Sequence, residues 1–214
     1  MASVDYTRAC RALMRRDPVI AALIRQHGDC GLASSPRTDP FHALLHAIIA
    51  QQLSTKAART IEARFAALFD GGPVPAAVAA ASDEQLRGAG LSPQKLRYVR
   101  DLSGRLLDGS LDLGTLASLS DDEVITALTN VKGIGRWTAE MFLMFRLHRF
   151  DVLPVGDLGI LKAVQRAYRL RKLPSPERLT KIGETWRPYR SVACWYLWAS
   201  LDAAPITKSR NGRG

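Results

Sequence analysis

The amino-acid sequence predicts an all-α fold. Ser82 and Ser120 each precede a Gln or Glu by three residues and open a pattern of helical period, which is the signature of a capped helix. Sustained period-two alternation is absent, so strands are not expected. With 214 residues, 47% of them hydrophobic, the chain can form one sizeable core or two small lobes.

Caps and helix-breaking residues place the elements in order. The helical pattern of residues 5–26 is broken only by Pro18, and Asp39 caps a helix whose first turn contains Pro40. The remaining patterns predict helices at residues 40–52, 54–69, 82–88, 93–108, 120–129, 136–147, 158–170, 176–184 and 188–201. We therefore expect about ten short helices.

The charge of the chain indicates a polyanionic partner. Lys and Arg number 30 against 20 Asp and Glu, a formal net charge of +10, and arginine supplies most of it. A domain this basic suits nucleic acid first and an anionic membrane surface second, and the forked guanidinium favours phosphate. Charge alone does not separate a nucleic-acid-binding protein from an ordinary basic one.

Cysteine usage and the longest apolar runs restrict the class further. Cys10, Cys30 and Cys194 are scattered and form no CxxC pair, which argues against a zinc ribbon or cysteine-ligated cluster and favours a reducing compartment. The N-terminus contains no apolar signal core, and the apolar runs at residues 43–50 and 192–201 are too short to cross a membrane. We expect a soluble intracellular protein, cytoplasmic in a bacterium and nuclear in a eukaryote.

A glycine turn between two predicted helices is the most informative feature. Gly133 and Gly135 flank Ile134 in the string VKGIGRWTA, where one helix stops and the next begins at once. Glycine permits positive φ and close approach to the backbone, and free amides at a helix N-terminus bind phosphate. Lys132 and Arg136 add charge beside the turn, while Ile134 would pack between the helices. A bare GxG between helices is more often a tight turn that uses glycine only for geometry.

Asp157 follows in a loop shaped by Pro154 and Gly156, where the next helix starts. Asp is a preferred N-cap, and most such residues have no further role. The full string VKGIGRWTA, however, matches the helix-hairpin-helix motif, and the Gly/Pro-rich loop with one Asp resembles the helix-hairpin-helix base-excision DNA glycosylases. By that resemblance Asp157 is the catalytic residue. Asp151 and Glu140 are weaker alternatives, because Asp151 is off the motif position and Glu140 lies in mid-helix.

One carboxylate is sufficient for the chemistry that the resemblance implies. Breaking an N-glycosidic bond builds positive charge on the sugar, which a carboxylate near C1′ stabilises while it orients or deprotonates water. A second acid is dispensable when the leaving base is already cationic, as an N3- or N7-alkylpurine is. We expect a monofunctional glycosylase that removes 3-methyladenine- and 7-methylguanine-type bases from duplex DNA by base flipping and so initiates base excision repair.

The QQLS segment provides the candidate for the side chain that fills the gap left by a flipped base. It resembles the QQxS segment of the DNA-3-methyladenine glycosylase II family, which makes Gln52 or Leu53 the inserted residue. Burial of Leu53 in an ordinary helix-connecting turn is expected about as strongly.

The late aromatic cluster resembles the WRPxRS…W helix of the same family. That resemblance places Trp137 and Trp198 in the base pocket, where aromatic faces attract cationic purines, and leaves Trp186 and Trp195 in the core. Relatives that also cut the DNA backbone carry a nucleophilic lysine where this sequence has Trp137, so the resemblance implies a monofunctional enzyme.

The resemblance also bears on cofactors. Some relatives ligate an iron–sulfur cluster through closely spaced C-terminal cysteines, which this sequence lacks. We expect no cluster and no organic cofactor. The family's hairpin commonly holds a monovalent cation through main-chain carbonyls, and Na⁺ or K⁺ would here contact Thr129, Val131 and Ile134.

The expected organisation is a two-lobed helical fold with the active site in the interlobe cleft. One lobe would contain the QQLS turn, and the other would carry the hairpin and Asp157. The resemblance covers residues 39–202, with the hairpin at 128–139, and corresponds to the helical part of the family without the N-terminal β-domain of some members. Residues 1–38 would form a helical segment packed on this core, and residues 203–214 a basic, disordered tail.

Damaged double-stranded DNA is the expected partner of a monomeric protein that contacts no membrane. Two alternatives stay open. A non-catalytic helix-hairpin-helix DNA-binding module would keep the glycine turn but have no use for Asp157. A glycosylase/lyase for oxidised or mismatched bases would require a nucleophile that forms a Schiff base.

Overall fold

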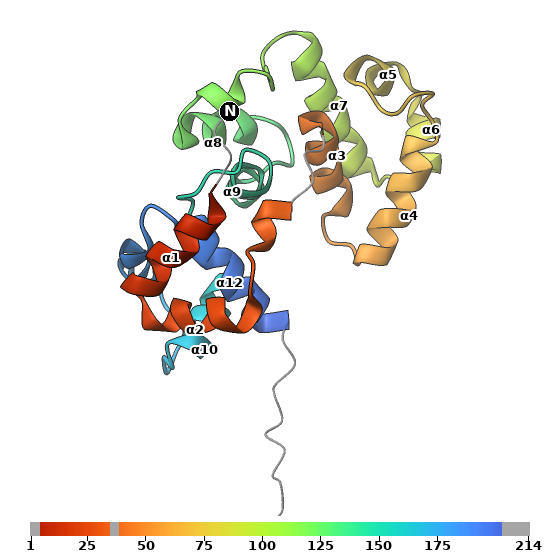
Figure 1. Cartoon of the computed structure of the whole chain (residues 1–214). Helices are drawn as coiled ribbons and strands as arrows, with labels where there is room; N and C mark the ends of the chain where they lie inside the picture. The colour runs from red at the N-terminus through yellow and green to blue at the C-terminus, as the bar shows by residue number, and fades with distance from the viewer. Residues whose placement is uncertain (1–4, 35–38, 203–214) are drawn as a thin grey trace, which may run out of the picture. The chain divides into compact units, whose positions relative to one another are not determined.

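The computed structural model describes residues 5–34 and 39–202, and it confirms the all-α class. Within these ranges the chain forms α-helices and short 3₁₀ helices but no strand (Figure 1). The α-helices are α1 Tyr6–Arg16, α2 Pro18–His27, α3 Pro40–Ala50, α4 Thr55–Ala66, α5 Pro75–Ala80, α6 Asp83–Gly88, α7 Pro93–Leu107, α8 Asp121–Thr129, α9 Arg136–Phe145, α10 Leu158–Ala167, α11 Pro176–Gly183 and α12 Arg190–Asp202. The 3₁₀ helices are η1 Gly31–Ser34, η2 Leu116–Ser118 and η3 Glu184–Trp186. The tail expected at residues 203–214 lies outside the described residues.

The helices belong to two compact units. The hairpin unit contains α3 to α9, within residues 39–147, and the aspartate unit contains α1, α2 and α10 to α12, within residues 5–34 and 148–202. The expectation that the hairpin and Asp157 share a lobe is wrong. Because α9 packs on α8 and α3, the hairpin stays with the QQLS turn, and the chain enters the aspartate unit before it reaches Asp157.

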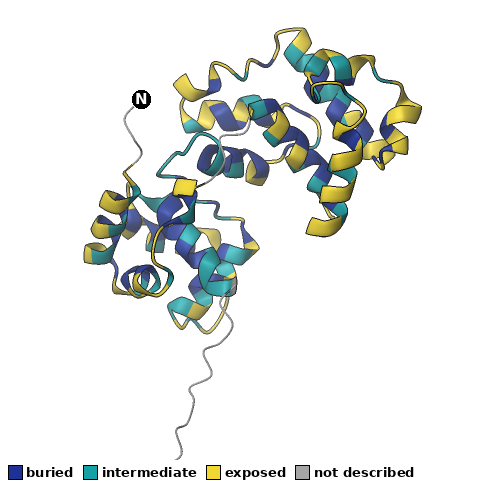
Figure 2. Ribbon diagram, turned by 45° about the vertical axis from the view of Figure 1, so that its right-hand side comes forward, coloured by how far each residue is buried: buried dark blue, intermediate teal, exposed yellow. Residues whose placement is uncertain are grey.

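The aspartate unit is built around α12. Six residues of this helix are completely buried: Ser191, Val192, Ala193, Cys194, Tyr196 and Leu197. A helix that is apolar on most sides must be covered by neighbours, and α1, α2 and α10 pack against α12. Figure 2 shows buried segments of the helices in dark blue. The N-terminal helices therefore share a core with the C-terminal helix.

Asp17 is the polar centre of this unit. It caps α2 through the N–H groups of Val19 and Ile20, and its Oδ2 accepts hydrogen bonds from Trp186 Nε1 (2.9 Å) and from the hydroxyl of Tyr168. Burial, together with the hydrogen bond to Asp17, raises the pKa of Tyr168. Trp186 is fully buried, as expected.

The expectation that Trp195 belongs to the core is wrong. Its side chain is only partly buried and covers Gly31, where a Cβ atom would lie 2.5 Å from the indole. The tryptophan therefore covers η1 and is not enclosed in the core.

The hairpin unit is organised by the fifteen-residue helix α7, which packs against α3, α5 and α6. Lys95 of this helix donates hydrogen bonds to the carbonyls of Ile49 (2.6 Å) and Gln51 (2.8 Å), so it satisfies the C-terminal end of α3. Burial lowers the pKa of Lys95. The capping boxes at Ser82 and Ser120 form as predicted.

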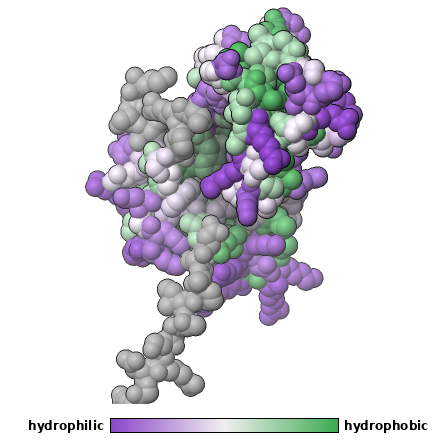
Figure 3. Space-filling model, turned by 90° about the vertical axis from the view of Figure 1, so that its right-hand side faces the viewer, coloured by the Kyte–Doolittle hydropathy of each residue, from purple (hydrophilic) through white to green (hydrophobic). Residues whose placement is uncertain are grey.

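The surface is mixed in character. Figure 3 shows hydrophilic side chains beside apolar areas on the face it presents. Exposed large apolar residues of the hairpin unit include Leu53, Leu68, Val74, Leu107 and Trp137. None of the described helices combines the length and apolar character needed to cross a bilayer.

Candidate active site and nucleic-acid interface

The predicted hairpin forms between α8 and α9, with Gly135 as the N-cap of α9. Ile134 is 4% exposed and packs inward, as expected. In the described part of the chain, the amides of Gly133 and Gly135 donate no hydrogen bond. Two unused donors at the start of a ten-residue helix, together with the positive end of its dipole, suit a phosphate group.

The two glycines are present for different physical reasons. Gly133 has a φ of +84°, and a Cβ atom there would lie 2.1 Å from the ring of Tyr98. Gly135 has a φ of −92°, which any residue adopts, and a Cβ atom there would meet nothing within 4 Å. The fold therefore requires glycine at position 133 only. The fold gives Gly135 no role of its own, and a ligand that touches the backbone would supply one.

Side chains from α7 and from the end of α3 hold the hairpin turn. Gln51 Nε2 donates to the carbonyl of Gly133 (2.7 Å), and Asp101 Oδ2 accepts the backbone N–H of Lys132 (2.9 Å). Burial raises the pKa of Asp101, but the Lys132 N–H and the Arg105 guanidinium lower it by more, so the net shift is downward. The turn conformation is therefore imposed partly from outside the hairpin.

The basic side chains beside the turn have acidic neighbours. Lys132 Nζ lies 3.6 Å from Asp101, and Arg136 Nε lies 3.0 Å from Glu140, while the Lys132 and Arg136 side chains are 69% and 65% exposed. The cationic ends are exposed although their carboxylate partners are only 14% and 6% exposed, so both cations remain accessible to a phosphate. Glu140 is 5% exposed and serves as the partner of Arg136.

The QQLS turn joins α3 to α4 in the same unit. Gln52 has a φ of +58° and is exposed, Leu53 is 37% exposed, and Ser54 caps α4. The alternative in which Leu53 is buried is therefore wrong. Both candidates for the inserted side chain project from a turn whose neighbouring residue, Gln51, is bonded to the hairpin.

Asp157 is the N-cap of α10, as predicted, and is only 9% exposed. Its Oδ1 accepts the N–H of Ile160 (2.7 Å) and the indole N–H of Trp198 (3.0 Å). A buried carboxylate is costly unless hydrogen bonds compensate it, and these two fix the orientation of the carboxylate plane. The structure thus brings together two predicted site residues, one from the start of α10 and one from α12.

Trp198 does more than the sequence predicted. It was expected only as an aromatic face of the pocket, yet it also donates to the candidate catalytic carboxylate. Gly159 lies under this pair, since a Cβ atom there would lie 3.0 Å from Asp157 Oδ1 and 3.1 Å from Trp198. Trp137 is 53% exposed and stands in the first turn of α9 in the hairpin unit.

Comparison with known proteins identifies the family. Residues 45–188 match the family described as HhH-GPD superfamily base excision DNA repair protein. The chain belongs to the HhH-GPD superfamily. It is 36% identical over 178 residues to DNA-3-methyladenine glycosylase 1 of Schizosaccharomyces pombe, covering 82% of this chain and 78% of the relative.

Solved structures of this superfamily have the same fold. The 3-methyladenine DNA glycosylase (Mag1) of Schizosaccharomyces pombe in complex with abasic DNA aligns with a TM-score of 0.81 and 32% identity, covering 94% of this chain and 100% of that one. The DNA-3-methyladenine glycosidase of Bacillus halodurans aligns with a TM-score of 0.83 and 37% identity, covering 91% and 89%.

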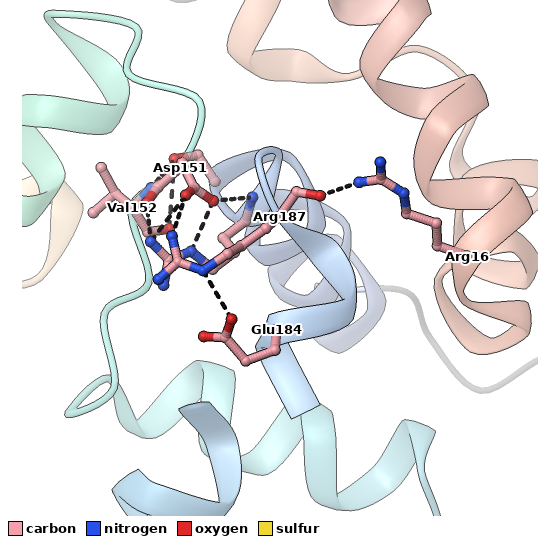
Figure 4. Close-up of polar contacts among 7 residues, drawn as sticks. Arg16, Asp151, Val152, Glu184 and Arg187 are labelled. Atoms are coloured by element: carbon pink, nitrogen blue, oxygen red, sulfur yellow. Dashed lines mark hydrogen bonds and ion pairs between the residues drawn. The ribbon is translucent and has the colours of Figure 1, made fainter. Parts of the chain in front are cut away.

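In this HhH-GPD chain, Asp151, the weaker alternative for the catalytic residue, is paired with two arginines. Its carboxylate accepts a hydrogen bond from Arg187 Nη1 (2.8 Å) (Figure 4). It also accepts one from Arg190 Nε (2.7 Å), and both arginines belong to the WRPYRS segment. A carboxylate between two guanidinium groups is a structural ion pair and a poor candidate for a general base.

Sequence reasoning missed the residues that support the site in this superfamily member. Gln51 precedes the residue singled out in the QQLS turn, and Tyr98 and Asp101 lie on a helix without any motif. Their spacing is ordinary for an amphipathic helix, so only the packing of α7 on the hairpin reveals what they do.

Proposed function

We propose that this protein is a monofunctional DNA glycosylase that hydrolyses the N-glycosidic bond of alkylated purines in duplex DNA, with Asp157 as its catalytic residue. The observation that carries the proposal is a buried carboxylate oriented by Trp198 Nε1 and Ile160 N–H, in a chain of the HhH-GPD superfamily. The relatives are named as 3-methyladenine glycosylases or glycosidases, and these names support alkylated purines as the substrate class.

The chemistry follows from charge. As the bond from C1′ to the base nitrogen lengthens, the deoxyribose gains oxocarbenium character, and an adjacent carboxylate stabilises it electrostatically. The alkylated base departs with the bonding electron pair, which neutralises the positive charge the base already carried. Asp157 then orients or deprotonates the water that attacks C1′, and the products are a free base and an abasic site.

Binding and selection of the lesion involve other residues. The unused amides of Gly133 and Gly135 with Lys132 and Arg136 would grip a phosphate without reading sequence. Leu53 or Gln52 would fill the gap left by the flipped nucleotide. A cationic purine is attracted to an aromatic face, which Trp198 and Trp137 offer, and each such contact contributes about 0.5–2 kcal/mol.

The hairpin is the proposed site of a monovalent cation. Thr129 ends α8, so its carbonyl lies at the negative end of the helix dipole, and Val131 and Ile134 follow within the turn. Bound Na⁺ or K⁺ would supply positive charge beside a DNA phosphate. We further propose that the enzyme acts as a monomer and without an iron–sulfur cluster or organic cofactor.

The test is Asp157→Asn assayed for base release from methylated duplex DNA. Asn is as good an N-cap as Asp, so the substitution removes charge while it keeps the helix cap. We expect loss of most excision, with normal or slightly tighter DNA binding, because a negative charge near phosphates disappears. Asp39→Asn, a matched change at the N-cap of α3, should leave excision intact.

Two outcomes would contradict the proposal. Retained excision by Asp157→Asn would remove Asp157 from the mechanism. Borohydride trapping of a covalent complex between the wild-type protein and DNA would favour the glycosylase/lyase alternative, because only a Schiff base is reduced to a stable adduct.

A further inference from the structure

The loop that carries Asp157 is fastened to α12 at both ends. At its start, Asp151 and Val152 are bonded to Arg190 and Ser191, the first two residues of the helix. At its end, Asp157 accepts the indole N–H of Trp198, two helical turns further along. One helix therefore sets the positions of both ends of the loop.

Arg190 and Asp151 form the stronger of the contacts at the start of the loop. Arg190 Nε donates to Asp151 Oδ1 (2.7 Å), and its Nη2 donates to Oδ2 (3.0 Å) and to the main-chain carbonyl of Asp151 (2.7 Å). The Arg190 side chain is 15% exposed and that of Asp151 27%. A forked guanidinium that meets a carboxylate in this way fixes orientation as well as distance.

Arg187 is a weaker partner of the same carboxylate. Its side chain is 48% exposed and is shared between Asp151 and Glu184, while its carbonyl accepts from Arg16. Solvent screens such a pair, so it contributes little. The position of Asp151 depends chiefly on Arg190.

The backbone beside Asp151 is tied down as well. Ser191 is fully buried, its Oγ accepts the N–H of Val152 (2.9 Å), and its own N–H donates to the carbonyl of Phe150 (2.9 Å). Val152 and Pro154 are buried, and Asp157 N–H closes a turn on the Pro154 carbonyl (3.0 Å). These contacts restrict the conformational freedom of the backbone between residues 152 and 157. A displacement of Asp151 is therefore transmitted to Asp157.

We propose that Arg190 is a positioning residue for the glycosylase reaction: through Asp151 it holds the loop so that the Asp157 carboxylate stays bonded to Trp198 and aligned with the sugar. The inference rests on the proposed role of Asp157. It also gives Arg190 of the WRPYRS segment a positioning role that is separate from DNA contact.

The experiment uses the full chain with Arg190→Gln, Arg190→Lys and Asp151→Asn. Arg178→Gln is the matched control, an exposed arginine of α11 in the same unit. Three quantities are measured at a temperature where each variant is folded: the single-turnover rate of base release from methylated duplex DNA, the Kd for abasic-site DNA, and the Tm.

We expect Arg190→Gln to lower the single-turnover rate about ten- to a hundredfold, which is the usual effect of displacing a reacting group by about 1 Å. The Kd should stay within about twofold, because the arginine faces Asp151 and not DNA. Asp151→Asn should reproduce the loss, and the double variant should lose no more than either single one, because the two residues act as a pair. Arg190→Lys should restore part of the rate.

Several results would overturn the inference. An unchanged rate with a lowered Tm would mean that the clamp serves stability only, and a raised Kd with an unchanged rate would mean that Arg190 contacts DNA. If Arg190→Gln does not fold, Asp151→Asn and Arg190→Lys give the same decision. Asp157→Asn, run in parallel, separates the two proposals: full activity there defeats the proposed function, whereas loss there with full activity in Arg190→Gln defeats only the positioning role.

Discussion

Gly133 and Gly135, two residues apart in the hairpin, allow a fold requirement to be separated from a ligand requirement. Gly133→Ala puts a Cβ atom 2.1 Å from the Tyr98 ring in a backbone of φ +84°. The left-handed conformation costs about 1–2 kcal/mol and overpacking against the ring about 1–3 kcal/mol, so we expect destabilisation of about 2–5 kcal/mol. Gly135→Ala meets open space at φ −92° and should change stability by less than about 1 kcal/mol.

The effects on DNA binding should have the opposite order. When only folded protein is counted, Gly135→Ala should weaken DNA binding more than Gly133→Ala does. A Cβ atom on Gly135 would hold a phosphate away from the amides of the α9 N-terminus. Loss of one charge-assisted hydrogen bond is worth about 1.5–3 kcal/mol, which corresponds to a Kd about 10- to 150-fold weaker. The loss should be equal for damaged and undamaged duplexes, because a phosphate contact does not read the base.

Urea denaturation and fluorescence anisotropy at one fixed salt concentration measure the two effects separately. Unchanged binding by Gly135→Ala would refute the view that the hairpin backbone grips DNA. A loss confined to lesion-containing duplexes would show that the residue acts near the base. A Gly133→Ala protein as stable as the wild type would show that Tyr98 yields without cost.

Two further substitutions test the supporting contacts. Trp198→Phe keeps an aromatic face but removes the N–H that donates to Asp157 Oδ1, so excision should fall about tenfold while the Kd for abasic-site DNA is preserved; undiminished excision would mean that Trp198 serves only as a stacking surface. Asp101→Asn should destabilise the protein by about 1–2 kcal/mol at pH 7 in urea denaturation, because the folded state lowers the pKa of this carboxyl through the Lys132 N–H and Arg105. Because the folded-state pKa of Asp101 is lowered, the ionised carboxylate stabilises the fold above the unfolded-state pKa of about 3.9, and this stabilisation is lost as the pH falls through the folded-state pKa. The difference in unfolding free energy between Asp101→Asn and wild type should therefore shrink below about pH 4. A difference in unfolding free energy that is independent of pH would contradict this assignment.

The helical class and most helix starts were readable from the chain. Caps such as Ser82, Ser120 and Asp157 act within three residues, so their effect is local and appears in sequence. Helix α5 went unpredicted because Val74 provides no side-chain cap and the segment is alanine-rich without a clear apolar face. The motif VKGIGRWTA and the loop before Asp157 could also be recognised from the sequence, because each consists of contiguous residues.

Other features were decided only by the tertiary structure, because they join residues far apart in sequence. The division into units assigns the hairpin and Asp157 to different units, although only the rest of α9 and the loop at residues 146–156 lie between them in the chain. Nothing in the spacing showed that Asp151 would be held by Arg190, that Trp198 would donate to Asp157, or that Tyr98 would make Gly133 obligatory. Local chemistry thus specified which groups are present, whereas packing of distant helices determined how each is oriented and which of them act together.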